Sequence, residues 1–136
     1  MPDQRRVTRE QYQAIATFRH HLRRFLSFSE AAAAGTGLPP QQHQALLAIA
    51  GHAGPGRPWV GSLAAQLVVA PHTAAELVSR MAEAGLVTKT AAMVDRRRAE
   101  LALTAKAEAM LEALTEAHLR ELEQLEPALA RALGRR

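Results

Sequence analysis

The chain has 136 residues and a formal net charge of +4, and 48% of its residues are hydrophobic although only 4% are aromatic. This length suffices for one domain with a buried core. The absence of cysteine excludes disulfide bonds, thiolate metal ligands and thiol redox chemistry. Because the first residues are polar and no apolar run approaches the roughly 20 residues of a membrane-spanning helix, we expect a soluble, cytoplasmic protein that contacts no membrane.

Two helices are predicted in the first third of the chain. Between about residues 10 and 34, apolar side chains recur every three or four residues and form one stripe, which indicates an amphipathic helix. The segment GTGLPP at 35–40 ends this helix, and Pro40 fits the first turn of a second helix that runs to about Gly51. The stripe of the first helix consists of Tyr12, Ile15, Phe18, Leu22 and Phe25.

The middle of the chain predicts two short helices joined by a three-residue turn, VVA. The first covers residues 61–67, and the second begins at Pro71 and ends at Gly85, which suits a helix C-terminus. A loop rich in Gly and Pro precedes them. Trp59 and Val60 are too short for an independent strand but can add one edge to a sheet.

A hairpin and a long helix complete the chain. Residues 86–89 and 99–103 read as two strands around a turn. Thr104 is a suitable N-cap for the last long helix, and Pro127 breaks or kinks that helix. Its apolar stripe consists of Ala107, Met110, Leu111, Leu114, His118, Leu122 and Leu125. This order of elements predicts a mainly α (α+β) fold: a winged helix-turn-helix flanked by long helices.

Three motifs in this order carry a resemblance to a known family. The run GSLAAQLVVAPHTAAELVSRMAEAGLV, Asp95 with Arg97, and LALT ending at Thr104 together resemble the helix-turn-helix, the Asp-x-Arg wing motif and the return strand of the multiple-antibiotic-resistance regulator (MarR) family of bacterial transcription factors. The resemblance is best over residues 38–104. It implies a homodimer that binds a pseudo-palindromic operator in double-stranded DNA and releases it on meeting a small organic ligand.

The resemblance also implies how the chain is divided. Residues 1–136 form a single domain, in which a winged helix-turn-helix lobe at 38–103 lies between dimerisation helices at 8–34 and 104–136. The predicted dimer contacts are Tyr12, Ile15, Leu114, His118, Leu122, Leu125 and Leu129.

The wing is predicted to contact DNA through three consecutive arginines. A guanidinium inserted into a narrow, strongly negative minor groove gains energy without reading a unique base pattern. The offset between Asp95 and Arg97 suggests a carboxylate that aims this guanidinium, as the family resemblance also implies. Arg96 and Arg98 are expected to meet phosphates. A merely solvated turn is the alternative.

The helix that begins at Pro71 is the predicted recognition helix, since the N-terminal turn of such a helix points at base edges. Ala70 precedes it where Ser, Asp or Asn would cap better, so its first amides are expected to rely on DNA or water. The predicted DNA contacts of the two helices are Ser62, Gln66, Pro71, His72, Thr73, Ala75, Ser79 and Arg80. Six basic and three acidic residues lie between Arg57 and Arg98, so non-specific affinity should fall steeply with salt.

The histidines give no metal site. His20 and His21 are adjacent on a helix and point about 100° apart, so they cannot share a metal. His43 and His118 lie near apolar stripes and are read as core or interface residues. In the resembled family the ligand pocket lies between the dimerisation helices and the DNA-binding lobe, which implies ligand contacts at Phe18, His21, Phe25, His43 and Leu47.

Other functions fit the sequence less well. It contains no nucleophile turn, no phosphate-binding Gly loop with its Lys and no metal-ligand spacing, so neither an enzyme nor a cofactor is expected. A winged-helix dimer that binds protein in place of DNA would present an apolar recognition helix or a neutral wing. A regulator for which the ligand is a co-activator stays open.

Overall fold

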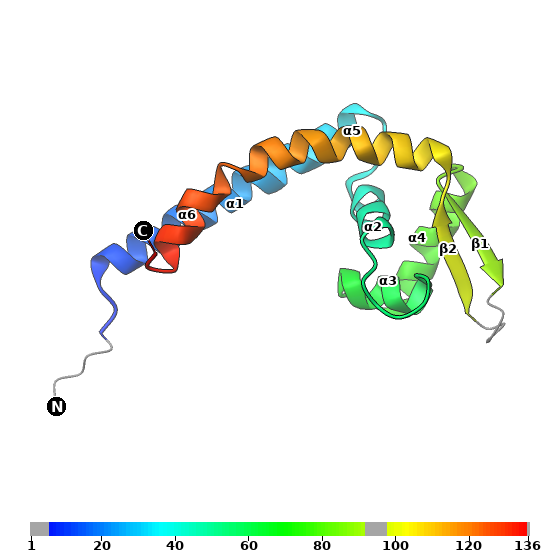
Figure 1. Ribbon diagram of the computed structural model, residues 1–136, viewed down its shortest axis with the longest axis horizontal. Helices are drawn as coiled ribbons and strands as arrows, with labels where there is room; N and C mark the ends of the chain where they lie inside the picture. The colour runs from blue at the N-terminus through cyan, green and yellow to red at the C-terminus, as the bar shows by residue number, and fades with distance from the viewer. Residues whose placement is uncertain (1–5, 92–97, 136) are drawn as a thin grey trace. The chain divides into compact units, whose positions relative to one another are not determined.

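The computed structural model describes residues 6–91 and 98–135. In these residues the order of elements is α1 (Arg9–Gly35), α2 (Pro40–Ala50), α3 (Val60–Leu67), α4 (Pro71–Glu83), β1 (Val87–Ala91), β2 (Ala99–Leu103), α5 (Ala105–Leu122) and α6 (Leu125–Ala132) (Figure 1). The predicted mainly helical fold with a two-stranded wing is confirmed. The chain divides into two compact units, Met1–Ala32 with Thr115–Arg136, and Ala33–Leu114. The lobe predicted at 38–103 lies wholly within the second unit.

The first unit is built from terminal helices. Its helix α1 begins one residue earlier than predicted because Thr8 and Gln11 form a capping box. The Gln11 N–H donates to Thr8 Oγ1 at 3.2 Å, and the Thr8 N–H donates to Gln11 Oε1 at 2.8 Å. At the other end of the chain, α5 ends at Leu122, so the break predicted at Pro127 was misplaced. Pro127 instead lies in the first turn of α6. The N–H groups of a first turn have no partner within the helix, so proline, which lacks an N–H, costs no helix hydrogen bond there.

A buried histidine joins α1 to α5 within this unit. His118 is buried, and one of its ring nitrogens lies 2.7 Å from Ser29 Oγ. The rings of Phe25 and Phe28 meet its ring edge-on, with centroids 5.7 and 5.3 Å away. His43 is also buried, on α2. The reading of His118 and His43 as core or interface residues therefore agrees with their burial.

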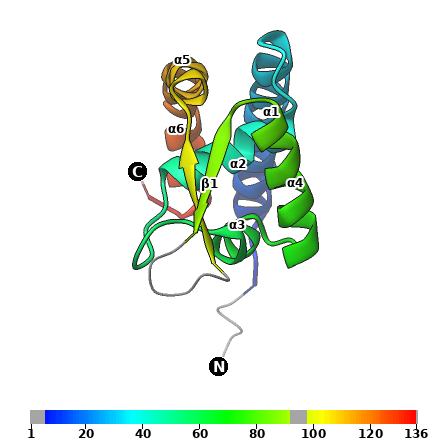
Figure 2. The ribbon, with the colours of Figure 1, turned by 90° about the vertical axis from the view of Figure 1, so that its right-hand side faces the viewer.

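The second unit forms the winged lobe. Helix α3 packs on α2 and α4, β2 contacts α2 and α3, and β1 contacts α4, which lies beside the hairpin in both ribbon views (Figures 1 and 2). The two strands pair antiparallel from Val87↔Leu103 to Ala91↔Ala99. Trp59 adds one bridge to Glu100, which confirms the predicted sheet edge. Among the described residues, the largest fully buried side chains all lie in this lobe: Leu38, Leu46, Met81, Leu101 and Val78.

Thr104 connects the start of α5 to the end of α4. Its hydroxyl donates to the Gly85 carbonyl at 2.7 Å and accepts the Ala107 N–H at 3.2 Å, so the predicted N-cap is confirmed. Gly85 has φ +74° and lets the Leu86 N–H turn back to the Met81 carbonyl at 2.9 Å. One threonine thus holds the last turn of the predicted recognition helix to the helix after the wing.

The turn between α3 and α4 contains a strained residue. Val68 has φ 57° and ψ 49°, the left-handed conformation, and 89% of it is exposed. This conformation costs an L-residue roughly 1–2 kcal/mol, and a β-branched side chain is an outlier in it. Because the Val68 side chain is exposed, it makes few contacts that could offset this cost in free energy.

We therefore expect Val68→Gly to raise the free energy of unfolding by about 0.5–1 kcal/mol, since relief of the left-handed strain exceeds the added chain entropy of glycine. Chemical denaturation measures the change. Val69→Gly is the matched control: Val69 does not have a positive φ, and glycine there should destabilise the lobe. Equal destabilisation by both substitutions would contradict the strain argument.

Candidate nucleic-acid interface

Helix α4 presents the predicted recognition residues to solvent. Its inner face is buried through Ala74, Val78 and Met81, which anchor it in the lobe. The opposite face is polar or small, as a helix that enters a groove requires. All six α4 residues predicted to contact DNA are exposed: Pro71, His72, Thr73, Ala75, Ser79 and Arg80.

The N-terminus of α4 is electrostatically suited to a phosphate. Ala70 is the N-cap residue, and no side chain among the described residues caps the helix, as predicted. The Ala70 carbonyl accepts the N–H groups of Thr73 and Ala74 at 3.0 and 3.1 Å. The partial positive charge of a helix N-terminus favours a bound anion.

On α3 the structure separates the two predicted contacts. Gln66 is exposed, whereas Ser62 is half-buried. Ser62 Oγ accepts the Trp59 N–H at 2.9 Å and donates its own proton to the Trp59 carbonyl at 2.9 Å. A phosphate oxygen can only accept hydrogen bonds, and Ser62 has no second proton to offer. The structure therefore shows Ser62 as a helix-capping residue, and its predicted contact with the DNA backbone stays a prediction.

The wing is described only at its root. Asp95, Arg96 and Arg97 lie outside the described residues, and their predicted roles stay predictions. Arg98 is exposed, and its guanidinium carbon lies 4.3 Å from the centroid of the Trp59 ring, a cation–π contact. The sequence predicted a phosphate contact for Arg98 but not this stacking partner.

Three residues of this surface were missed in the sequence. Trp59 was read only as a strand edge, and Gly61 beneath its ring was not singled out. Glu76 is exposed on α4, three residues after Thr73 and three before Ser79. That helical spacing was a usable signal. A carboxylate facing DNA is disfavoured near phosphates but can accept a hydrogen bond from cytosine N4.

The predicted ligand residues are only partly brought together. Within the terminal-helix unit, His21 and Phe25 line a cavity of about 160 Å³. Phe18 is half-buried but does not line it. His43 and Leu47 belong to the other unit, where His43 is buried and Leu47 exposed. The remaining residues around this cavity are Arg24, Phe28, Glu121, Gln124 and Leu125.

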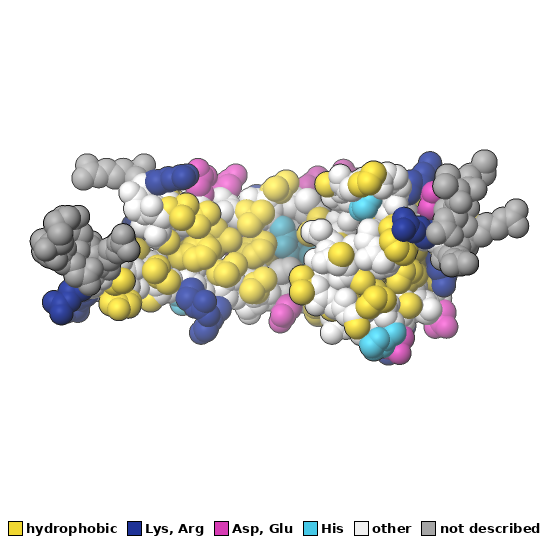
Figure 3. Space-filling view, turned by 90° about the horizontal axis from the view of Figure 1, so that it is seen from below, with side chains coloured by type: hydrophobic (Ala, Val, Ile, Leu, Met, Phe, Trp, Pro, Cys, Tyr) yellow, Lys and Arg dark blue, Asp and Glu magenta, His cyan; other side chains and the backbone are white. Residues whose placement is uncertain are grey.

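Large apolar side chains are exposed on the terminal helices, and Figure 3 shows hydrophobic side chains gathered over that part of the molecule. Four of the predicted dimer contacts are among them: Tyr12, Ile15, Leu122 and Leu129. Leu125 is half-buried, and Leu114 and His118 are buried within the chain. Exposed apolar residues of this unit that the sequence reading missed are Val7, Leu26, Leu119 and Leu133.

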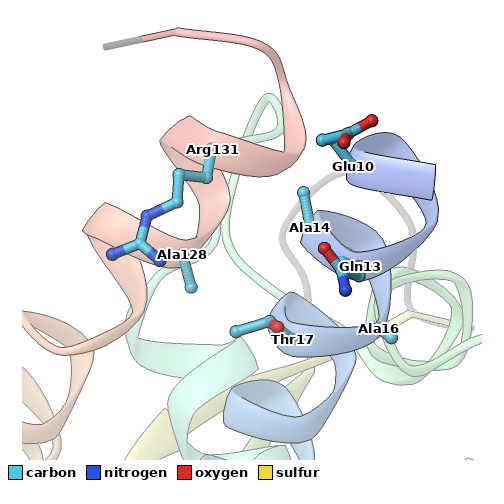
Figure 4. A pocket seen from close by; sticks show the side chains of 7 residues that line it. All are labelled: Glu10, Gln13, Ala14, Ala16, Thr17, Ala128 and Arg131. Carbon is cyan, nitrogen blue, oxygen red and sulfur yellow. The ribbon is translucent and has the colours of Figure 1, made fainter. Parts of the chain in front are cut away.

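A groove of about 450 Å³ runs between α1 and α6 in the same unit (Figure 4). Its walls consist mostly of small or short side chains, and Glu10 and Arg131 carry its charges. The lining residues are Glu10, Gln13, Ala14, Ala16 and Thr17 from α1 and Ala128 and Arg131 from α6.

Metal ligands and membrane spans are not seen in the described ranges. No group of three or more His, Cys, Asp or Glu in residues 6–91 and 98–135 is placed to hold a metal ion. In the same residues no helix has both the length and the apolar character needed to cross a bilayer.

Comparison with known proteins agrees with this geometry. Residues 36–98 match the model of the MarR family, and no curated protein sequence matches the chain. A MarR family protein from Bacillus stearothermophilus is similar in structure, with TM-score 0.70, 23% identity, and coverage of 84% of this chain and 77% of that one.

Two further solved structures share the fold and hold ligands. A point mutant of S. aureus MepR bound to an oligodeoxyribonucleotide has TM-score 0.67 and 20% identity, and covers 80% of this chain and 78% of its own. CouR from Rhodococcus jostii RHA1, bound to p-coumaroyl-CoA, has TM-score 0.58 and 23% identity, with coverage of 79% and 68%. With the family match over residues 36–98 and the shared fold of the solved structures, the winged lobe of the chain belongs to the MarR family, a family of DNA-binding transcriptional regulators that are not enzymes.

Proposed function

We propose that the chain is a homodimeric, cytoplasmic repressor that binds a pseudo-palindromic operator and is released from it by a small organic ligand. The observation that carries the proposal is the exposed polar face of α4, whose N-terminus no described side chain caps. In this proposal α4 enters the major groove, and Thr73 and His72 at its first turn read base edges. Gln66 contacts the backbone, and the arginines of the wing lie along the minor groove.

The exposed apolar residues of the terminal helices support a dimer. Monomeric proteins rarely expose large contiguous apolar patches, yet Tyr12, Ile15, Leu119 and Leu122 are all exposed in this unit. A second copy would bury them in a two-fold interface in which each residue is used twice. The groove lined by Ala14 and other small side chains (Figure 4) can receive a helix of that copy.

The cavity beside Phe25 and Phe28 supports a ligand site. Its volume of about 160 Å³ suits one aromatic ring, and His21 and Arg24 supply polar groups at its lining. CouR, a structural relative, is bound to p-coumaroyl-CoA. We propose His21 and Phe25 as ligand contacts, and Phe18, His43 and Leu47 stay as sequence-based proposals.

Selection from a random DNA duplex pool at near-physiological salt tests the function. We expect enrichment of a pseudo-palindrome whose half-sites lie about one helical turn apart. Salt-sensitive binding without an enriched sequence would contradict specific operator binding and favour a protein partner. Transcription from a promoter carrying the selected site then gives the sign of regulation, and a ligand-dependent increase without prior repression would favour the activator alternative.

A further inference from the structure

We propose that Trp59 is a positioning residue for DNA binding, which acts through Arg98 by holding the root of the wing against the start of α3. The proposal rests on the DNA-binding function of the lobe. Trp59 is the residue before α3 and has an extended backbone, with φ −144° and ψ 174°. It is also the only tryptophan of the chain.

Main-chain contacts already bring this segment to the root of the wing. Trp59 forms an antiparallel bridge with Glu100, and the Leu101 N–H donates to the Pro58 carbonyl at 2.8 Å. On the other side, Ser62 holds the Trp59 main chain to the first turn of α3 through two hydrogen bonds of 2.9 Å. Trp59 is therefore fixed between α3 and β2.

The ring of Trp59 lies directly against the backbone of Gly61. A Cβ at residue 61 would lie 2.3 Å from Cη2, 2.6 Å from Cζ3 and 2.7 Å from Cζ2 of the ring. The backbone at Gly61 is helical and its φ is not positive, so turn geometry does not require glycine there. Because glycine is a poorer helix former than alanine, the space for the ring is the physical reason for its presence in the first turn of α3.

The indole presents its face to Arg98, whose guanidinium carbon lies 4.3 Å from the ring centroid. Arginine has much rotamer freedom to lose when it contacts a phosphate, and stacking restricts that freedom beforehand. The N–H donors of a guanidinium lie in its plane, so contact through its face is compatible with a phosphate at its edge. Since Arg98 leads directly into β2, the same contact fixes where the wing joins the lobe.

Gly61→Ala is the most selective test, because its effects on the helix and on the ring have opposite signs. Alanine favours the helix and so offsets part of the packing that is lost when its methyl group displaces the ring from Arg98, and the lobe should stay folded. We expect affinity for the selected operator to fall about three- to tenfold, the size of one partly exposed cation–π contact. The fluorescence of Trp59 should become more sensitive to acrylamide quenching. Gly35→Ala adds the same methyl group where nothing lies within 4 Å. It should change neither the operator affinity nor the quenching of Trp59 fluorescence.

Substitutions of the two stacked residues test the coupling and cover the case in which Gly61→Ala fails to fold. Trp59→Phe keeps an aromatic face and should retain most of the affinity, while Trp59→Leu should lose as much as Gly61→Ala. Trp59→Leu combined with Arg98→Gln should bind no more weakly than Arg98→Gln alone. Additive losses would show that Trp59 does not act through Arg98. Unchanged operator affinity in Gly61→Ala, with altered Trp59 fluorescence, would overturn the positioning role while leaving operator binding itself intact.

Discussion

Leu122→Asp is expected to separate the proposed homodimer and to abolish specific operator binding in the same step. Leu122 is 41% exposed at the end of α5, close in sequence to the exposed Leu119. In a two-fold symmetric dimer each copy carries the substitution, so the interface contains two substituted residues. Two lost leucine burials and two desolvated carboxylates should together cost at least about 4 kcal/mol, or roughly a thousandfold in the dimer dissociation constant.

The loss of the dimer should remove operator specificity because each monomer then contacts a single half-site. Sedimentation over a concentration series measures the dimer, and titration of the selected duplex measures the affinity. Ala113→Asp is the matched control: Ala113 is exposed on the same helix, and nine residues of α-helix place it about half a turn from Leu122. This control should remain dimeric. A Leu122→Asp monomer with full operator affinity would contradict the dimeric mode of binding.

The order of helices and strands could be predicted because its signals are local. The apolar stripe of α4, the glycine at its end and the N-cap Thr104 each lie within one turn of the feature that they determine. Local signals also led to an error, because they placed the break between the last two helices at Pro127 and not before α6. Proline is tolerated in the first turn of a helix as well as at its end, and periodicity alone does not distinguish the two positions for Pro127.

Side-chain partners could not be predicted, because they depend on residues far apart in the sequence. Nothing in the sequence near Trp59 shows that Arg98 stacks on its ring. The stripe of α5 likewise identified an apolar face without showing what covers it. Leu114 on that stripe is buried within the chain, whereas Leu122 is exposed and open to a partner.

Arg97→Ala is expected to weaken specific operator binding by about 1–3 kcal/mol, or roughly five- to 150-fold, the size of one good contact to DNA. Arg97 lies outside the described residues, so the expectation rests on its place two residues after Asp95 and on the hairpin that carries it. That hairpin is held at its root, where Arg98 stacks on Trp59. A guanidinium carried on a hairpin fixed in this way loses less entropy when it enters a minor groove.

The salt dependence of binding separates this role from a general electrostatic one. If Arg97 contacts both the minor groove and the phosphates beside it, Arg97→Ala should lower the affinity for the operator more than the affinity for random duplex. The same substitution should reduce the slope of log affinity against log salt concentration by about one. Arg19→Ala is the control, since Arg19 is an exposed arginine on α1, and it should leave operator affinity unchanged. Equal losses on operator and random duplex would assign Arg97 to the phosphates alone. Unchanged operator affinity with an intact fold would refute the wing assignment, and the recognition helix would then have to supply the specificity by itself.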